Sequence, residues 1–341
     1  MMEVLRAALI IVVLSWTAVG QEDAIAARRE GANSSQLYVV QPADLPAVVA
    51  ALKEHFPQAL PLFVQARNML SGKCVWPLTQ LILDKFPDFT VAMTRPVPRD
   101  DNATQEYVVR GKTRQAVSFF AKDSAALRRF LRDNFMQLVD WYRPVIFSAV
   151  PVEFVPLMIE ETTHIGNIRI EDGQHDNRSD HVLLLRAKDL QRSTAPALPA
   201  GYRLGVLEPQ HIPLLLSQWK FVGRLGHGVD ATPYFRYLLT HGFPSVALFD
   251  QQGQLVAGNI YEPDGNLGQG FVKAADGQQG AYLEIVNRHL AEKVFSQLGQ
   301  ETAWAYIQED DAATLRSYEQ LGAHKAAHFT TQTLDYIPYM I

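Results

Sequence analysis

Apolar positions in the first half of the chain alternate between helical spacing and short unbroken runs. Intervals of three and four begin after Asp44 and again after Asp123 or Ser124, residues that can cap a helix. The spacing predicts helices over residues 45–56, 76–86, 124–135 and 152–165, and strands over residues 60–64, 89–93, 106–110 and 181–185. This alternation indicates a mixed α/β fold.

The second half has a clearer order of elements. It predicts strands over residues 202–207, 245–249, 254–261, 269–274 and 323–333, with one more strand in the run TAWAYIQEDD, and helices starting near Glu208, Thr232, Ala281 and Asp311. Short turns separate the three strands from 245 to 274, so we expect them to be antiparallel. The resulting order is β-α-α-β-β-β-α-β-α-β.

The segment of residues 189–201, DLQRSTAPALPAG, has no periodicity and is rich in Pro and Ala. We expect a domain boundary there, between an α/β domain of residues 36–195 and a second domain of residues 196–341. Residues 1–35 resemble a targeting segment. The apolar run 7–19 is typical of a secretory signal peptide, whereas Arg28 and Arg29 favour a mitochondrial one.

Composition narrows the function classes. The net charge is −5, hydrophobic residues make up 48% and charged residues 20% of the chain, and no basic stripe is present, which argues against nucleic-acid binding. Cys74 is the single cysteine, so no intrachain disulfide is possible. The spacing of Cys and His matches no metal site, and we expect none.

The predicted order resembles the GNAT acyltransferase fold, with a glycine-containing turn after the fourth strand. Three runs resemble the C-terminal domain of the glycine N-acyltransferase family: LEPQHIPLLLSQWKFVG, TPYFRYLLTHGFPSVALFDQQGQLVAG and DDAATLRSYEQLGAHK. In the first half, LILDKFPDFTVAM resembles that family's N-terminal domain. The resemblance covers residues 36–337. It implies a mixed, mainly antiparallel GNAT sheet preceded by a second GNAT-like α/β domain.

The resemblance also implies a reaction. An acyl group passes from acyl-CoA, a co-substrate rather than a permanently bound cofactor, to the amine of glycine or a related small amino acid. A monomeric protein in mitochondria is the corresponding expectation, and the signal-like N-terminus indicates the secretory pathway as the alternative. A transferase acting on protein lysines or N-termini remains a less favoured possibility.

GNAT enzymes bind the pyrophosphate of acyl-CoA on a turn at a helix N-terminus, where N–H groups and the helix dipole attract phosphate. The matching residues here are Gly277, Gln278, Gln279, Gly280 and Ala281. Gly277 replaces the usual Arg or Gln, which removes one contact. The alternative interpretation is an ordinary β-to-α turn that needs glycine for a positive φ.

Five further residues complete the expected acyl-CoA side. The backbone of Phe271 and Val272 matches the strand that carries the pantetheine arm, and an N–H there can polarise the thioester carbonyl. Trp219 and Phe221 are candidates for a substrate pocket, or for ordinary core packing. Tyr318 matches the tyrosine that donates a proton to the leaving thiolate, and its alternative role is packing with neighbouring leucines.

At the position of the general base this sequence departs from the family pattern. The family resemblance implies a Glu where this chain has Gln254, which cannot accept the proton. Glu262, at the end of the same predicted strand, is the candidate substitute, although YEPDG also suits an exposed hairpin end. The alternative to catalysis is therefore a weak or inactive acyl-CoA-binding protein.

Overall fold

A computed structural model describes residues 37–97, 108–109, 112–170, 179–218, 229–268, 270–273 and 279–339. Its first half contains β1 (Tyr38–Val39), α2 (Leu45–Lys53), α3 (Leu60–Ser71), β2 (Thr79–Leu83), β3 (Val91–Pro96), β4 (Val108–Val109), β5 (Lys112–Thr113), β6 (Gln115–Val117), β7 (Phe119–Ala121), α4 (Ser124–Leu138), β8 (Val145–Pro151), α5 (Val155–Thr162), β9 (Gly166–Ile170) and β10 (Asp180–Arg186). A short 3-10 helix at Val152–Phe154 precedes α5.

The second half repeats this order of elements. It contains α6 (Ala187–Arg192), β11 (Arg203–Gly205), α7 (Ile212–Gln218), β12 (Val229–Asp230), α9 (Thr232–Thr240), β13 (Ser245–Phe249), β14 (Leu255–Ile260), β15 (Phe271–Val272), α10 (Gln279–Leu298), β16 (Thr302–Gln308), α11 (Ala312–Gln320) and β17 (His324–Pro338). A 3-10 helix at Pro209–His211 leads into α7. From β11 to β17 the principal elements follow the order expected for a GNAT fold.

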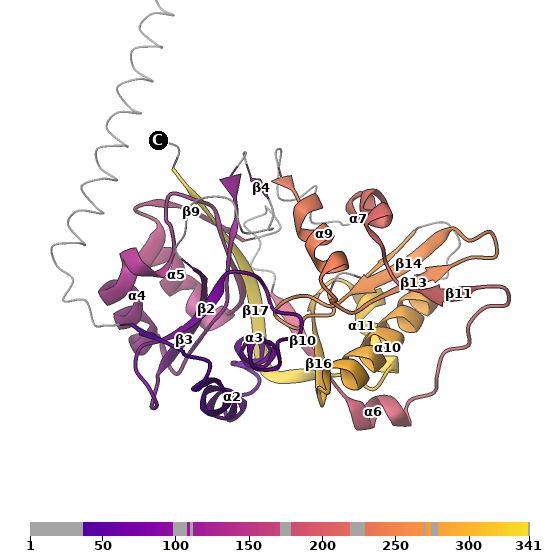
Figure 1. Cartoon of the computed structure of the whole chain (residues 1–341), viewed down its shortest axis with the longest axis horizontal. Coiled ribbons are helices and arrows are strands. Elements are labelled where there is room, and N and C mark those ends of the chain that lie inside the picture. The colour runs from indigo at the N-terminus through magenta and orange to yellow at the C-terminus, as the bar shows by residue number, and fades with distance from the viewer. Residues whose placement is uncertain are drawn as a thin grey trace, which may run out of the picture.

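Strands of the two halves share one sheet. An antiparallel sheet β1-β2-β3-β7 belongs to the first half and another, β11-β13-β14-β15, belongs to the second. Between them lies the sheet β16-β10-β17-β8-β6, in which β17 also pairs with β9. The long strand β17 runs between the first half, on the left of Figure 1, and the second half on the right. The mixed, mainly antiparallel character of the predicted sheets is confirmed.

The proposed domain boundary stays a prediction. The first residues of the boundary segment belong to helix α6, and residues 193–202 connect this helix to β11. β10, which precedes the boundary, lies between β16 and β17, and pairs with β16 along its whole length from Asp180↔Gln308 to Arg186↔Thr302. The two halves are therefore joined by backbone hydrogen bonds as well as by the linker.

Two predicted elements are wrong. Residues 60–64 were expected to form a strand but begin helix α3, because a run of four apolar side chains is too short to show its period. Residues 76–86 were expected to form a helix but contain strand β2, which pairs with β1 and β3. Leu81, Ile82 and Leu83 are all buried there, and a strand covered on both faces loses its alternating pattern.

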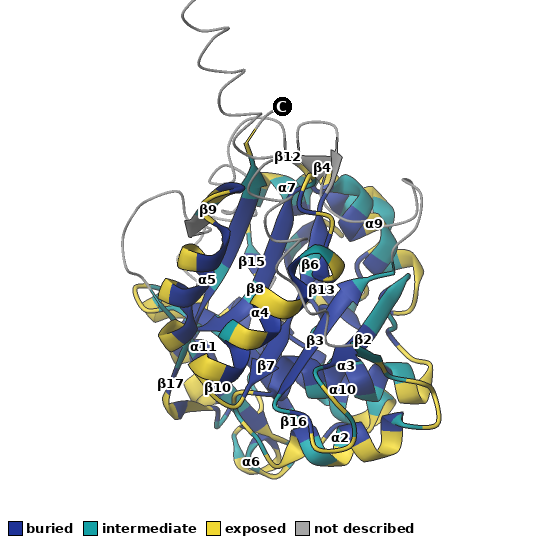
Figure 2. Ribbon diagram, turned by 90° about the vertical axis from the view of Figure 1, so that its left-hand side faces the viewer, coloured by how far each residue is buried: buried dark blue, intermediate teal, exposed yellow. Residues whose placement is uncertain are grey.

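Buried residues, dark blue in Figure 2, are concentrated in the strands of the sheets, whereas helices such as α4 also carry exposed residues, drawn in yellow. One core cluster fills the second half around β13, β14, α10 and β16, and others fill the first half. The second-half cluster also includes Leu60, Val64, Cys74 and Trp76 from the first half. Part of the first half is thus built into the core of the second.

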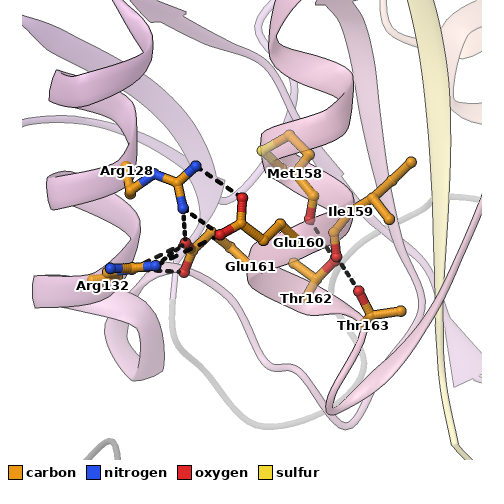
Figure 3. Close-up of polar contacts among 8 residues, drawn as sticks. All are labelled: Arg128, Arg132, Met158, Ile159, Glu160, Glu161, Thr162 and Thr163. Carbon is orange, nitrogen blue, oxygen red and sulfur yellow. Dashed lines mark hydrogen bonds and ion pairs between the residues drawn. The ribbon is translucent and has the colours of Figure 1, made fainter.

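Helices α4 and α5 are held together by charged side chains (Figure 3). The Glu161 side chain is 1% exposed and its Oε1 lies 3.0 Å from Arg128 Nη1 and 2.8 Å from Arg132 Nη2. Glu160, with 55% of its side chain exposed, also pairs with Arg128. Hydrogen bonds from the arginines compensate the burial of the Glu161 carboxylate.

We expect Glu161→Gln to lower the free energy of unfolding by about 2 kcal/mol, because it removes charge-assisted bonds from a buried acceptor. The matched control is Glu160→Gln, one residue away and solvent-exposed, for which the change should be much smaller. Urea unfolding followed by circular dichroism measures both. Equal losses would show that burial of Glu161 does not strengthen its ion pairs.

Candidate functional site

Residues 266–268 precede β15 and lie beside β16. We call this segment the fork, because the chain leaves β16 there and β15 pairs with a different strand. Asn266 bridges to Trp304 in a parallel arrangement, and Leu267 N–H donates to the Trp304 carbonyl at 2.9 Å. Beyond this point β15 pairs with β14, through Ala257↔Val272 and Gly258↔Phe271. β16 instead lies at the edge of the central sheet, beside β10. Diverging strands leave backbone groups that a ligand can bind.

Tyr318 reaches this fork from α11. Asp311 begins the helix, because its Oδ1 accepts a hydrogen bond from Thr314 N at 3.1 Å, which confirms the predicted cap. The Tyr318 side chain is buried and its hydroxyl donates to the Leu267 carbonyl at 2.6 Å. Burial raises the pKa of the phenol above its usual value. Tyr318 therefore keeps its proton and acts as a hydrogen-bond donor.

A network of buried amides supports the same carbonyl. Asn259 on β14 donates from Nδ2 to Leu267 O at 2.8 Å and to Asn287 Oδ1 at 2.7 Å. Asn287 on α10 donates to Ser317 Oγ at 3.2 Å. The network connects α10, α11 and the fork. Sequence reasoning missed these residues, although a polar residue inside the apolar runs VAGNI and EIVNRHL is a usable signal.

Glu262 lies in the loop after β14 and is 8% exposed. Its Oε1 accepts a hydrogen bond from the Tyr234 hydroxyl at 2.6 Å, and its Oε2 accepts one from Asn266 Nδ2 at 2.6 Å. Asn266 in turn accepts from Tyr306 N at 3.1 Å. The expectation of a surface carboxylate at a hairpin end is wrong, because the loop folds back against β16 and α9.

Residues 266 and 267 connect the two candidate catalytic side chains. Asn266 holds the Glu262 carboxylate, and the next residue, Leu267, accepts the Tyr318 hydroxyl. Tyr318 and Glu262 thus approach adjacent residues of one backbone segment. Gln254 is elsewhere: it is exposed in the β13–β14 turn, where its N–H donates to Asp250 Oδ1 at 2.8 Å.

A second carboxyl lies on the same loop as Glu262. Asp264 Oδ1 accepts a hydrogen bond from Asn266 N at 3.1 Å, and burial raises the pKa of the Asp264 carboxyl to about 6. Burial, together with the negative charges of Asp264 and Glu262, raises the pKa of the Tyr306 phenol well above its usual value. The fork is therefore an acidic, partly desolvated environment, which attracts a protonated amine.

The proposed phosphate turn is described only in part. Gly277 and Gln278 lie outside the described residues, and Gln279 is the first residue of α10. Gly280 and Ala281 are exposed in the first helical turn, and a Cβ added at Gly280 would meet no atom within 4 Å. Gly280 does not have a positive φ, so the alternative explanation of a strained turn does not apply to it. Its exposed first turn suits an anion.

The remaining predicted residues are placed as follows. Phe271 is buried and Val272 half-buried on β15, beside the fork, and their role in holding pantetheine stays a prediction. Trp219 and Phe221 lie outside the described residues. In the part of the chain that the structure describes, His, Cys, Asp and Glu form no cluster of three suited to a metal ion. Among the same residues, no helix is long and apolar enough to span a membrane.

Comparisons by sequence find no matching family model and no matching curated protein. Solved structures do match. A Drosophila protein superposes with a TM-score of 0.67 at 16% identity, over 89% of this chain and 98% of its own. The fold of this chain is therefore similar to that of a whole solved protein.

Two more distant structures carry acyltransferase names. A GCN5-related N-acetyltransferase from Sphaerobacter thermophilus has a TM-score of 0.48 at 13% identity, over 90% of this chain and 96% of its own. A tandem GNAT protein from the clavulanic acid biosynthesis pathway has the same TM-score and identity, over 88% and 97%. Similarity as low as 13% sequence identity does not show that this chain has the same activity.

Proposed function

We propose that this protein is an acyl-CoA-dependent N-acyltransferase whose acceptor is the amine of glycine or a related small amino acid. The observation that carries the proposal is the placement of Tyr318 and Glu262 at one fork, held by adjacent residues 266 and 267. Aminolysis of a thioester requires a hydrogen-bond donor to the leaving thiolate and an acceptor for the proton of the amine. Tyr318 is the donor and Glu262 is the acceptor.

In this proposal the acyl-CoA pyrophosphate binds at the first turn of α10, and its pantetheine arm follows β15. The amine nitrogen attacks the thioester carbon, so a C–N bond forms and the C–S bond breaks. Glu262 takes the proton that the amine loses. The Tyr318 hydroxyl moves its hydrogen bond from the Leu267 carbonyl to the departing thiolate and stabilises its negative charge. The proton that Glu262 has taken from the amine then passes through solvent to the sulfur. The products are the N-acyl amine and coenzyme A.

The test is release of free thiol from a panel of acyl-CoAs, each with and without a panel of amines that includes glycine. The proposal requires release that depends on the amine. The assay is favourable here because Cys74 is the single cysteine, and burial raises the pKa of its thiol to about 11, which keeps it unreactive. Tight binding of acyl-CoA without transfer would instead identify an acyl-CoA-binding protein.

We expect Tyr318→Phe to lower kcat by roughly 100-fold, because the thiolate loses its donor. The dissociation constant for acyl-CoA should change little. Tyr336→Phe is the matched control: Tyr336 is also a buried tyrosine, but its hydroxyl lies 3.0 Å from the Trp141 carbonyl, in the first half. Stopped-flow or steady-state thiol release measures both variants. A Tyr318→Phe enzyme with unchanged kcat would remove Tyr318 from the mechanism.

A further inference from the structure

The loop of residues 72–78, between α3 and β2, has an unusual backbone. Cys74 and Leu78 both adopt left-handed conformations, with φ of 51° and 53°. Residues other than glycine rarely adopt such a conformation because it is unfavourable, so surrounding contacts must enforce it. The loop is part of the first half, yet Cys74 and Trp76 belong to the core of the second half.

Charged side chains of the first half fix this loop and α3 to the end of α10. Lys73 Nζ donates to the Gln297 carbonyl at 2.9 Å, and Arg67 Nη2 donates to the Leu298 carbonyl at 3.2 Å and also to that of Gly299. These carbonyls end the helix and have no partner within it. Cations at a helix C-terminus are favourable. The loop therefore has a defined position relative to the second half.

Trp76, in this loop, packs against two tyrosines of α9, one of which contacts Glu262. Its side chain is buried, and its ring lies 5.5 Å from the ring of Tyr234 and 4.8 Å from that of Tyr237, measured between centroids. The Tyr237 hydroxyl donates to the Val75 carbonyl at 3.3 Å. Aromatic pairs at these distances are favourable and fix ring orientation. Two tyrosines of α9 are thus packed on one tryptophan from the first half.

The two tyrosines differ in what their hydroxyl groups contact. Tyr234 donates to Glu262 Oε1 at 2.6 Å, whereas Tyr237 bonds to the loop backbone. A continuous path therefore leads from Trp76 through Tyr234 to the carboxylate at the fork. The other carboxylate oxygen, Oε2, accepts from Asn266 Nδ2, whose backbone N–H donates to Asp264, and the charges of Glu262 and Asp264 also act on Tyr306 of β16.

We propose that Trp76 and Tyr234 are positioning residues, through which the first half of the chain orients the Glu262 carboxylate for proton transfer. The inference rests on the proposed function for its catalytic meaning. It assigns a role to the first half, which supplies Trp76 and the strained loop of residues 72–78.

The test compares Tyr234→Phe with Tyr237→Phe, a matched control that removes a hydroxyl from the same aromatic group. Loss of the Tyr234 hydroxyl removes a hydrogen bond that favours the charged carboxylate, so the pKa of Glu262 should rise. The acid limb of the kcat/KM profile should move to higher pH, with a loss of up to about tenfold on that limb and little change on the neutral plateau. Tyr237→Phe should leave the limb in place.

Carbon-13 NMR of the Glu262 carboxyl, assigned with Glu262→Gln, gives a readout that does not need activity. Its titration should move to higher pH in Tyr234→Phe and in Trp76→Ala, and Trp76→Phe should largely restore it. If amine-dependent transfer is absent, the proposed function fails, and the titration still decides whether Trp76 and Tyr234 control Glu262. Identical titrations in Tyr234→Phe, Tyr237→Phe and the unmodified protein overturn the inference.

Discussion

Replacing Asp335 with alanine should lower the free energy of unfolding by about 3–5 kcal/mol, because it leaves the charge of Arg114 buried without its carboxylate partner. Arg114 and Asp335 form an ion pair in which their side chains are 2% and 12% exposed. Arg114 directly precedes β6, and Asp335 lies on β17 opposite Ile146 of β8. The pair therefore connects the first half to the strand that ends the chain.

Chemical denaturation of Asp335→Ala, Glu301→Ala and the unmodified protein tests this prediction. Glu301 forms an ion pair with Lys53 at 3.8 Å in which 87% and 57% of the side chains are exposed, so its loss should have little effect. A double substitution, Arg114→Met with Asp335→Leu, should recover much of the stability, since no buried charge remains. If Asp335→Ala is no less stable than Glu301→Ala, the Arg114 charge is compensated by other groups.

Local signals in the sequence were reliable where they depend on neighbouring residues. Asp311 and, as one of two alternatives, Asp123 were predicted as helix caps, and both carboxylates cap their helices, with Asp123 Oδ1 accepting from Ala126 N at 2.7 Å. Asp44, also predicted as a cap, begins α2 but forms no side-chain cap bond, because its carboxylate accepts from Gln41 N at 2.9 Å instead. Strand 245–249 coincides with β13, and the strand expected in TAWAYIQEDD is β16. Capping and hairpin patterns act within a few residues, so one chain segment contains the information.

Contacts between residues far apart in the sequence could not be predicted from the sequence. β10 was predicted as a strand, but its place between β16 and β17 depends on segments more than a hundred residues away. Glu262 looked like a surface carboxylate because its partner Tyr234 lies 28 residues earlier in the sequence. The hydrogen bond between Asn259 and Asn287 could not be predicted for the same reason, since these residues are also far apart in the sequence. Such contacts are determined by tertiary packing rather than by the local preference of each segment for helix or strand.

The two halves differ where phosphate binding would occur. Helix α4 corresponds in order to α10, but its first turn is capped by the Asp123 carboxylate. A negative side chain there already satisfies an N–H group and opposes a second anion. The first turn of α10 instead exposes Gly280 and Ala281. Under the proposed function, this contrast favours one acyl-CoA site, in the second half, with Trp76 of the first half acting on the acceptor side.

Glu262→Gln should lower kcat/KM for the amine by roughly 10²–10⁴-fold, the usual contribution of a general base. Glutamine has the same shape, and its amide oxygen can still accept the Tyr234 hydroxyl, but it cannot take a proton at neutral pH. Binding of acyl-CoA should be unaffected. The deficit should narrow as the pH approaches the pKa of the amine, because solution then deprotonates the acceptor.

Gln254→Glu is the complementary variant. It restores a carboxylate where the family resemblance implies the base, yet position 254 is an exposed turn residue that bonds to Asp250. We expect no gain in kcat/KM, either alone or combined with Glu262→Gln. Thiol-release kinetics over a range of pH compare the four proteins. Recovery of activity in the double variant would move the base from Glu262 to position 254, and with it the acceptor site from the fork to the β13–β14 turn.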